Sequence, residues 1–262
     1  MTLPAADGPS LPAERRKLPA RVLFKQAFRM VREHPRESML PLFVIQAPVA
    51  VIAGAFTAIL YFTAFSDEAY ASAKGAPLLA LLLMAAFEGL FAQVARAGTI
   101  VSVAAVARGR PKSLSESLDP AFTRMGPLIV LVAILAAGFG LGILSVIGLV
   151  VLPYLVLRLA ISFETFILEE LGPWAAVRRS WTLMTGNLMR LLGLVTLNLF
   201  ATIGPLAAIQ ALALISGSTR TQEVLLGSVI GAVQGILLIP VIAFLTASTT
   251  LFYLNLMEPP SD

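Results

Sequence analysis

The chain has 262 residues, of which 58% are hydrophobic and 13% are charged, and its formal net charge is +4. A soluble globular domain carries about 25% charged residues, so this composition excludes a soluble globule and indicates a polytopic membrane protein. The absence of cysteine excludes disulfides and thiolate sites, and the single histidine, His34, excludes multi-histidine metal sites. We therefore expect no metal and no cofactor.

Two segments precede the first long apolar run. Residues 1–17 are rich in Pro, Ala and Gly, which predicts a disordered cytoplasmic tail. Leu18–His34 is predicted to form an amphipathic helix that ends at Pro35. Basic residues three or four positions apart give this helix one charged face, and they are Arg21, Lys25, Arg29, Arg32 and Arg36. The neighbouring apolar stripe consists of Phe24, Phe28 and Val31.

The long apolar runs predict six membrane spans within one domain, residues 18–257. One crossing needs roughly 20 helical residues. The expected spans are about residues 39–65, 77–107, 127–141, 145–168, 191–215 and 224–257. Spans three and four come from one apolar run that is about 63 Å long as a helix, so it must fold back. We expect the turn at Gly138–Gly142 and a bend of span six at Pro240.

Two further amphipathic segments are predicted, one before span three and one before span five. In Ser113–Arg124, Ser113 and Glu116 have the spacing of a capping box. The other, Trp174–Thr185, contains both tryptophans of the chain, and indole rings favour the membrane interface. The expected fold class is thus all-α, a polytopic membrane protein with six transmembrane helices as three hairpins, each preceded by a cytoplasmic amphipathic segment.

The basic residues predict the orientation in the membrane. Of the 19 Lys and Arg residues, 15 lie in alternate connecting segments or the N-terminal region, and the intervening segments carry only Lys74 and Arg220. The other two, Arg96 and Arg158, fall within apolar runs. Because basic segments remain in the cytoplasm during insertion, we expect both termini there. Residues 258–262 are then a short cytoplasmic tail.

Several stretches resemble one family of membrane proteins. They are Pro153-Tyr-Leu-Val-Leu-Arg158, Phe163-Glu-Thr-Phe-Ile-Leu-Glu169, Ala176-Val-Arg-Arg-Ser-Trp-Thr-Leu-Met-Thr-Gly-Asn187 followed by Arg190, and Gly109-Arg-Pro-Lys-Ser-Leu-Ser-Glu-Ser-Leu118. They resemble a bacterial six-span group that includes the membrane domain of some glycerophosphoryl diester phosphodiesterases and related proteins of unknown function. The resemblance implies a multi-pass protein of the bacterial cytoplasmic (inner) membrane.

The resemblance does not extend to phosphodiesterase activity, which belongs to a separate barrel. Such a barrel takes about 250 residues, and this chain has no soluble segment of that size. The C-terminal Phe252-Tyr-Leu-Asn-Leu-Met257 also lacks the charged ending that the family often has.

Four charged residues lie inside predicted spans, and they are Glu88, Arg96, Arg158 and Glu164. Each costs roughly 2.5–3.5 kcal/mol near the centre of a span unless it is paired or hydrated. They therefore form either a structural ion-pair network or a polar cavity for an anionic ligand or lipid headgroup. A stripe of glycines in span six, Gly227, Gly231 and Gly235, predicts close helix packing.

We expect a non-enzymatic membrane protein that organises lipids or partner proteins at its cytoplasmic face. The expected partner is the bilayer with its anionic headgroups, a membrane protein is a further candidate, and no nucleic acid is expected. The candidate face comprises Arg21, Lys25, Arg29, Arg32, Trp174, Arg178, Arg179 and Trp181. The alternative is a small transporter or permease-like subunit with a polar site around Arg96 and Arg158. An enzyme would have only Glu88 and Glu164 as intramembrane acid and base. The oligomeric state stays open.

Overall fold

The computed structural model of the protein describes residues 18–64, 76–144, 146–212 and 220–257. Within these ranges the regular elements are helices and no strand is present. The helices are α1 (Ala20–Glu33), α2 (Pro35–Ala64), α4 (Ala76–Ala107), α5 (Leu114–Thr123), α6 (Met125–Leu144), α7 (Val146–Leu159), α8 (Ser162–Leu168), α9 (Pro173–Leu183), α10 (Leu188–Ala211), α11 (Arg220–Leu237) and α12 (Ile239–Met257). The two predicted tails and the predicted outer segment with Lys74 lie outside the described residues.

Six stretches of helix are long and apolar enough to cross a membrane. They are Pro35–Leu60, Leu79–Ala107, Met125–Ile143, Val150–Leu168, Leu188–Ala211 and Leu225–Met257. The all-α class and the six candidate spans therefore agree with the sequence-based prediction. Because a bilayer offers no water to backbone groups, helices of this kind satisfy their own N–H and C=O groups.

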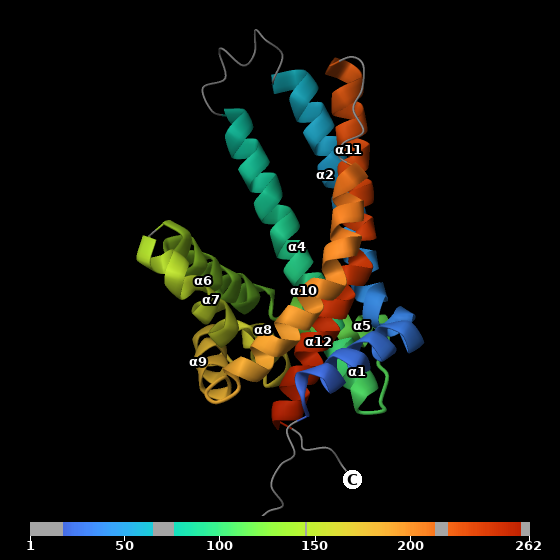
Figure 1. The fold of residues 1–262 in the computed structure, drawn as a ribbon. Helices are drawn as coiled ribbons and strands as arrows, with labels where there is room; N and C mark the ends of the chain where they lie inside the picture. The colour runs from blue at the N-terminus through green and yellow to red at the C-terminus, as the bar shows by residue number, and fades with distance from the viewer. Residues whose placement is uncertain (1–17, 65–75, 145, 213–219, 258–262) are drawn as a thin grey trace, which may run out of the picture.

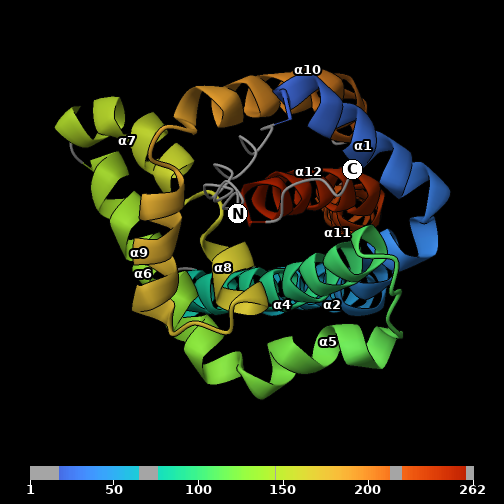
Figure 2. The ribbon, with the colours of Figure 1, turned by 90° about the horizontal axis from the view of Figure 1, so that it is seen from below.

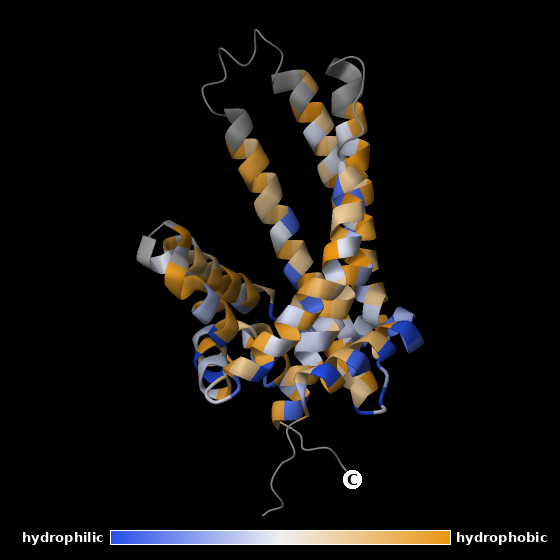
Figure 3. Ribbon diagram, in the orientation of Figure 1, coloured by the Kyte–Doolittle hydropathy of each residue, from blue (hydrophilic) through white to orange (hydrophobic). Residues whose placement is uncertain are grey.

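The helices divide into a long apolar part and a shorter polar end. α2, α4 and α11 extend upward from the base, whereas α1, α5 and α9 lie across the lower end (Figure 1). Viewed from below, these three helices and α10 surround α12 (Figure 2). Hydrophilic residues are concentrated at this lower end (Figure 3). We call it the basic end, after the exposed residues Arg21, Lys25, Arg29, Arg32, Arg110, Lys112 and Arg178.

The helices α2 and α11 pack closely against each other at two glycines. A Cβ added at Gly54 would lie 2.8 Å from the carbonyl oxygen of Ser228, and one at Gly235 would lie 2.9 Å from the Cβ of Ala50. Any side chain at these two positions would therefore separate the helices. The predicted glycine stripe is confirmed at Gly235 only, because a Cβ at Gly227 or Gly231 would have no neighbouring atom within 4 Å.

The predicted turn at Gly138–Gly142 is wrong. α6 continues through these glycines to Leu144, and α7 begins at Val146. Glycine is common in transmembrane helices, and unpaired backbone groups are costly in an apolar medium, so these glycines do not end the helix. The resulting α6–α7 pair leans away from the other helices (Figure 1).

Two spans are interrupted. The fourth is broken at Ala160 and Ile161, between α7 and the buried seven-residue helix α8. The sixth is broken at Leu238, between α11 and α12. Pro240 lacks a backbone donor, and its ring conflicts with the carbonyl group of residue 236. The predicted bend near Pro240 is thus confirmed.

Two shorter helices begin where the sequence predicts. Ser113 caps α5: its hydroxyl accepts the backbone N–H of Glu116 at 3.4 Å, and the Glu116 carboxylate accepts the backbone N–H of Ser113 at 2.8 Å. Pro173 occupies the first turn of α9. Gly186 follows this helix with φ +78°, a left-handed conformation that suits glycine. Local chemistry therefore defines these helix ends.

Candidate functional site

One side of α1 is a charged surface. Its basic residues Arg21, Lys25, Arg29 and Arg32 are exposed. The opposite side buries Leu23 and Ala27 against the bundle. Phe24 packs edge-on against Phe244, with ring centroids 5.4 Å apart. The predicted apolar stripe differs at Phe28, which is 58% exposed.

A hydrogen-bonded junction fixes the start of α1. The backbone N–H of Leu18 donates to Oδ1 of Asn255 at 3.1 Å. The Nε of Arg190 donates to the carbonyl oxygen of Leu18 at 2.6 Å, and its guanidinium also donates to Asn255. This guanidinium lies 5.2 Å from the ring centroid of Phe252. One arginine of α10 therefore links α1 to α12.

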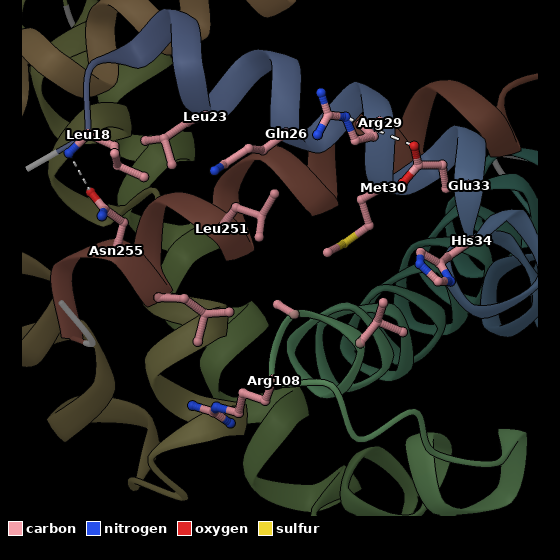
Figure 4. A pocket seen from close by; sticks show the side chains of 13 residues that line it. Leu18, Leu23, Gln26, Arg29, Met30, Glu33, His34, Arg108, Leu251 and Asn255 are labelled. Carbon is pink, nitrogen blue, oxygen red and sulfur yellow. Dashed lines mark hydrogen bonds and ion pairs between the residues drawn. The ribbon is translucent and has the colours of Figure 1, made fainter. Parts of the chain in front are cut away.

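A pocket of about 420 Å³ lies between α1, the last turn of α4 and α12. Met30 points into it, and Arg108 lies across it from α1 (Figure 4). Arg29 forms a 4.0 Å ion pair with Glu33 at the rim. His34 also lines the pocket. With histidine neutral, the lining carries two arginines and one glutamate, so its formal charge is +1.

The walls of this pocket combine two kinds of surface. Val106, Leu251 and Leu254 supply apolar contact, whereas Gln26 and Asn255 supply amide groups. A pocket of this size with both polar and apolar walls suits an amphipathic molecule. The net positive charge of its lining favours an anionic headgroup. We call it the headgroup pocket.

Of the four α9 residues in the predicted candidate face, three are exposed and one makes internal contacts. Trp174, Arg178 and Trp181 are exposed. Arg179 instead donates to the carboxylate of Glu169 at 3.0 Å, and it is not part of the exposed face. The hydroxyl group of Tyr253 donates to the same carboxylate at 3.0 Å. Arg179 therefore helps hold α9 to α12.

The two halves of the predicted face do not come together. Seen from below, α1 and α9 lie on opposite sides of the molecule (Figure 2). The basic residues of α1 and the tryptophans Trp174 and Trp181 of α9 therefore form two separate patches of the basic end. The α1 side combines exposed cations with the headgroup pocket.

Two of the four intramembrane charges form an ion pair. The guanidinium group of Arg96 lies 3.6 Å from Oε1 of Glu164, whose side chain is fully buried. The hydroxyl group of Thr249 donates to the same oxygen at 2.6 Å. Arg96 also lies 4.8 Å from the ring centroid of Phe163. This pair joins α4, α8 and α12, which fits the structural alternative in the sequence-based prediction.

The other two charges lie elsewhere. Arg158 donates to the hydroxyl groups of Tyr154 and Thr185, each at 2.8 Å, and its guanidinium packs over the ring of Trp181. Glu88 forms no ion pair within the described residues. The four charges therefore do not form one network, and no cavity joins Arg96 to Arg158 among the described pockets.

Sequence reasoning missed Glu169, Asn255 and Arg190 as junction residues. The sequence does indicate that Asn255 makes a contact, because an amide group within an apolar span requires a hydrogen-bond partner. Arg190 follows the break at Asn187, and nothing local indicates that it binds the start of α1. Within the described residues no group of three or more His, Asp or Glu side chains gathers to hold a metal ion.

Comparison of the chain with known protein families, curated proteins and solved structures found no match. The resemblance to the bacterial six-span group therefore stays a prediction, and the function is argued from the geometry alone.

Proposed function

We propose that the protein is a non-enzymatic, multi-pass protein of a bacterial cytoplasmic membrane that binds anionic lipid headgroups at its basic end. The observation that carries this proposal is α1, whose exposed cations stand beside the headgroup pocket. Each Lys or Arg near an anionic membrane surface contributes about 1 kcal/mol of attraction. The pocket adds apolar walls for the first part of a lipid chain.

The proposed orientation places the basic end in the cytoplasm, together with the start of α1 and the end of α12 (Figure 1). It follows from the excess of basic residues there. The cysteine-free chain allows a direct check with Lys112→Cys, because Lys112 is exposed at this end. A membrane-impermeant maleimide should label this variant in inverted vesicles and leave it unlabelled in right-side-out vesicles. The opposite result would reverse the topology.

Lipid retention tests the headgroup proposal. The variant Arg21→Gln, Lys25→Gln, Arg29→Gln and Arg32→Gln removes the cations of α1. After purification from membranes, mass spectrometry should find less phosphatidylglycerol bound to this variant than to the wild type. Bound phosphatidylethanolamine should stay unchanged.

A matched variant controls for loss of net charge and for misinsertion. It changes three exposed basic residues outside α1 and its charged face, namely Arg110, Lys112 and Arg178, to Gln. The proposal expects this variant to retain its phosphatidylglycerol. Equal losses in both variants, or no loss in either, would contradict a site on α1. Loss of an acidic protein rather than lipid would favour the partner-binding alternative.

The structure does not support the alternative of a transporter with a polar site around Arg96 and Arg158. Arg96 is neutralised by Glu164, and Arg158 binds residues of α7 and α9. We therefore do not propose a transport site between these two arginines.

A further inference from the structure

Glu88 lies in a groove within the membrane-spanning part of the bundle, remote from the headgroup pocket. The groove is formed by two adjoining cavities of about 570 Å³ and 190 Å³, which share Ala50, Glu88, Gly235 and Leu238. Its polar lining consists of Gln46, Thr57, Glu88, Gln210, Ser228 and Gln234. These residues come from α2, α4, α10 and α11. We call it the Glu88 groove.

The described lining of this groove contains a negatively charged group and no positively charged one. Glu88 is its single ionisable group, and none of the described lining residues is Lys, Arg or His. The other intramembrane carboxylate, Glu164, has Arg96 beside it. A carboxylate at this depth is costly without a counter-charge. A cationic ligand would supply that counter-charge.

The groove is also rich in hydrogen-bond acceptors. Oε1 of Gln46 is buried and has no hydrogen-bond donor. The amide nitrogen of Gln234 donates to the carbonyl oxygen of Ile209 at 3.0 Å, which leaves its own oxygen as an acceptor. Buried acceptors without donors cost free energy. An ammonium group carries three N–H donors, so it would satisfy both the charge and the acceptors.

The remaining lining is small and apolar. Gly227 and Gly231 leave open space where other residues would place a Cβ, and Ala53 and Leu238 complete the wall. Small-molecule sites typically enclose about 300–1,000 Å³ with mostly apolar walls and a few polar groups. We propose that the Glu88 groove binds an amphipathic amine, with its ammonium group at Glu88 and its hydrocarbon part along the glycine wall.

A single cysteine can report occupancy of the groove, because the chain has none of its own. Gly231→Cys places the thiol in the groove without a clash. Gly204→Cys on α10 has equally open surroundings but does not line the groove. In lipid nanodiscs, octylamine should slow the reaction of the Gly231→Cys thiol with N-ethylmaleimide and should not affect the Gly204→Cys thiol.

Two comparisons, octanol as the ligand and the Glu88→Gln variant, test whether binding depends on the ammonium group and on the Glu88 carboxylate. Octanol has the same hydrocarbon chain without the charge, so about tenfold more of it should be needed for equal protection. Glu88→Gln, combined with Gly231→Cys, should raise the octylamine requirement by a similar factor without lowering the melting temperature. Equal protection by amine and alcohol, or undiminished protection after Glu88→Gln, would overturn the proposal. A Gly231→Cys thiol that never reacts would show a closed groove and would overturn it as well.

Discussion

Arg96 and Glu164 form an ion pair of 3.6 Å between α4 and α8, and the glutamate side chain has no exposed surface. The second oxygen of this carboxylate has no hydrogen-bond partner in the structure. A buried pair of this kind is sensitive to the loss of either member, because the remaining charge is then buried alone. It therefore sets how α8 sits against α4 and α12.

Removing the cation of this pair should destabilise the fold. Arg96→Met leaves the Glu164 carboxylate without its counter-charge, and the free energy of unfolding should fall by about 3–5 kcal/mol. The double variant Arg96→Met, Glu164→Gln removes both charges and should be more stable than the single variant. Thermal unfolding in detergent measures both. A double variant that is less stable than the single one would contradict the ion-pair account.

The junction at Asn255 should control the N-terminal helix. Asn255→Leu removes the acceptor for the N–H of Leu18 and for Arg190, so α1 should detach more often. We expect faster amide hydrogen exchange in residues 20–26, with unchanged exchange in α5. Asn255→Asp keeps the acceptor and serves as the control. Equal protection of α1 in all three proteins would show that apolar packing alone holds this helix.

The hydroxyl group of Tyr253 should stabilise the contact between α9 and α12. It donates to the Glu169 carboxylate, and a hydrogen bond to a charged group contributes about 1.5–3 kcal/mol. Tyr253→Phe should lower the free energy of unfolding by that amount, because the ring is kept and only the donor is lost. Tyr154→Phe removes the more exposed hydrogen bond between Arg158 and the hydroxyl group of Tyr154, so it should lower the free energy of unfolding by less. A larger loss of stability in Tyr154→Phe than in Tyr253→Phe would contradict this account.

The capping box of α5 should depend on pH. Hydrogen bonds from the backbone and the hydroxyl group of Ser113 lower the pKa of Glu116 below its ordinary value. A lowered pKa in the folded state stabilises the helix above the ordinary pKa, and this stabilisation is lost as pH falls through the lowered value. The protection factors of the amides at residues 114–118, which compare each exchange rate with that of a free amide at the same pH, should therefore fall in acid. Ser113→Ala should already have low protection factors at neutral pH and should lose most of this pH dependence.

Helix ends with local signals are predictable from the sequence. Ser113 with Glu116 marks the start of α5, and Pro240 lies beside the break of the last span. The break at Ala160 and Ile161 has neither proline nor glycine, so no local signal predicts it. The glycines of α6 misled the prediction, because in a membrane the cost of unpaired backbone groups exceeds the low helix propensity of glycine.

The candidate site was less predictable, because it depends on contacts between distant segments. On sequence alone, Arg96 and Arg158 are expected together in one ion-pair network or polar cavity. The break after Leu159 separates them: Glu164, beyond the break, pairs with Arg96, whereas Arg158 binds α9. Glu88 was recognised as an intramembrane charge, but the groove around it requires α2, α10 and α11, which only the fold brings together.

The most direct test of headgroup binding is photo-crosslinking from within the headgroup pocket. A photoreactive residue replaces Gln26, which lines this pocket, and a second protein carries it at the exposed Leu79, near the opposite end of α4. In nanodiscs that mix phosphatidylglycerol with phosphatidylcholine, the position-26 probe should capture phosphatidylglycerol in excess of its share of the lipid. The position-79 probe should capture both lipids in proportion. Proportional capture at both positions would contradict an anionic headgroup site at the basic end.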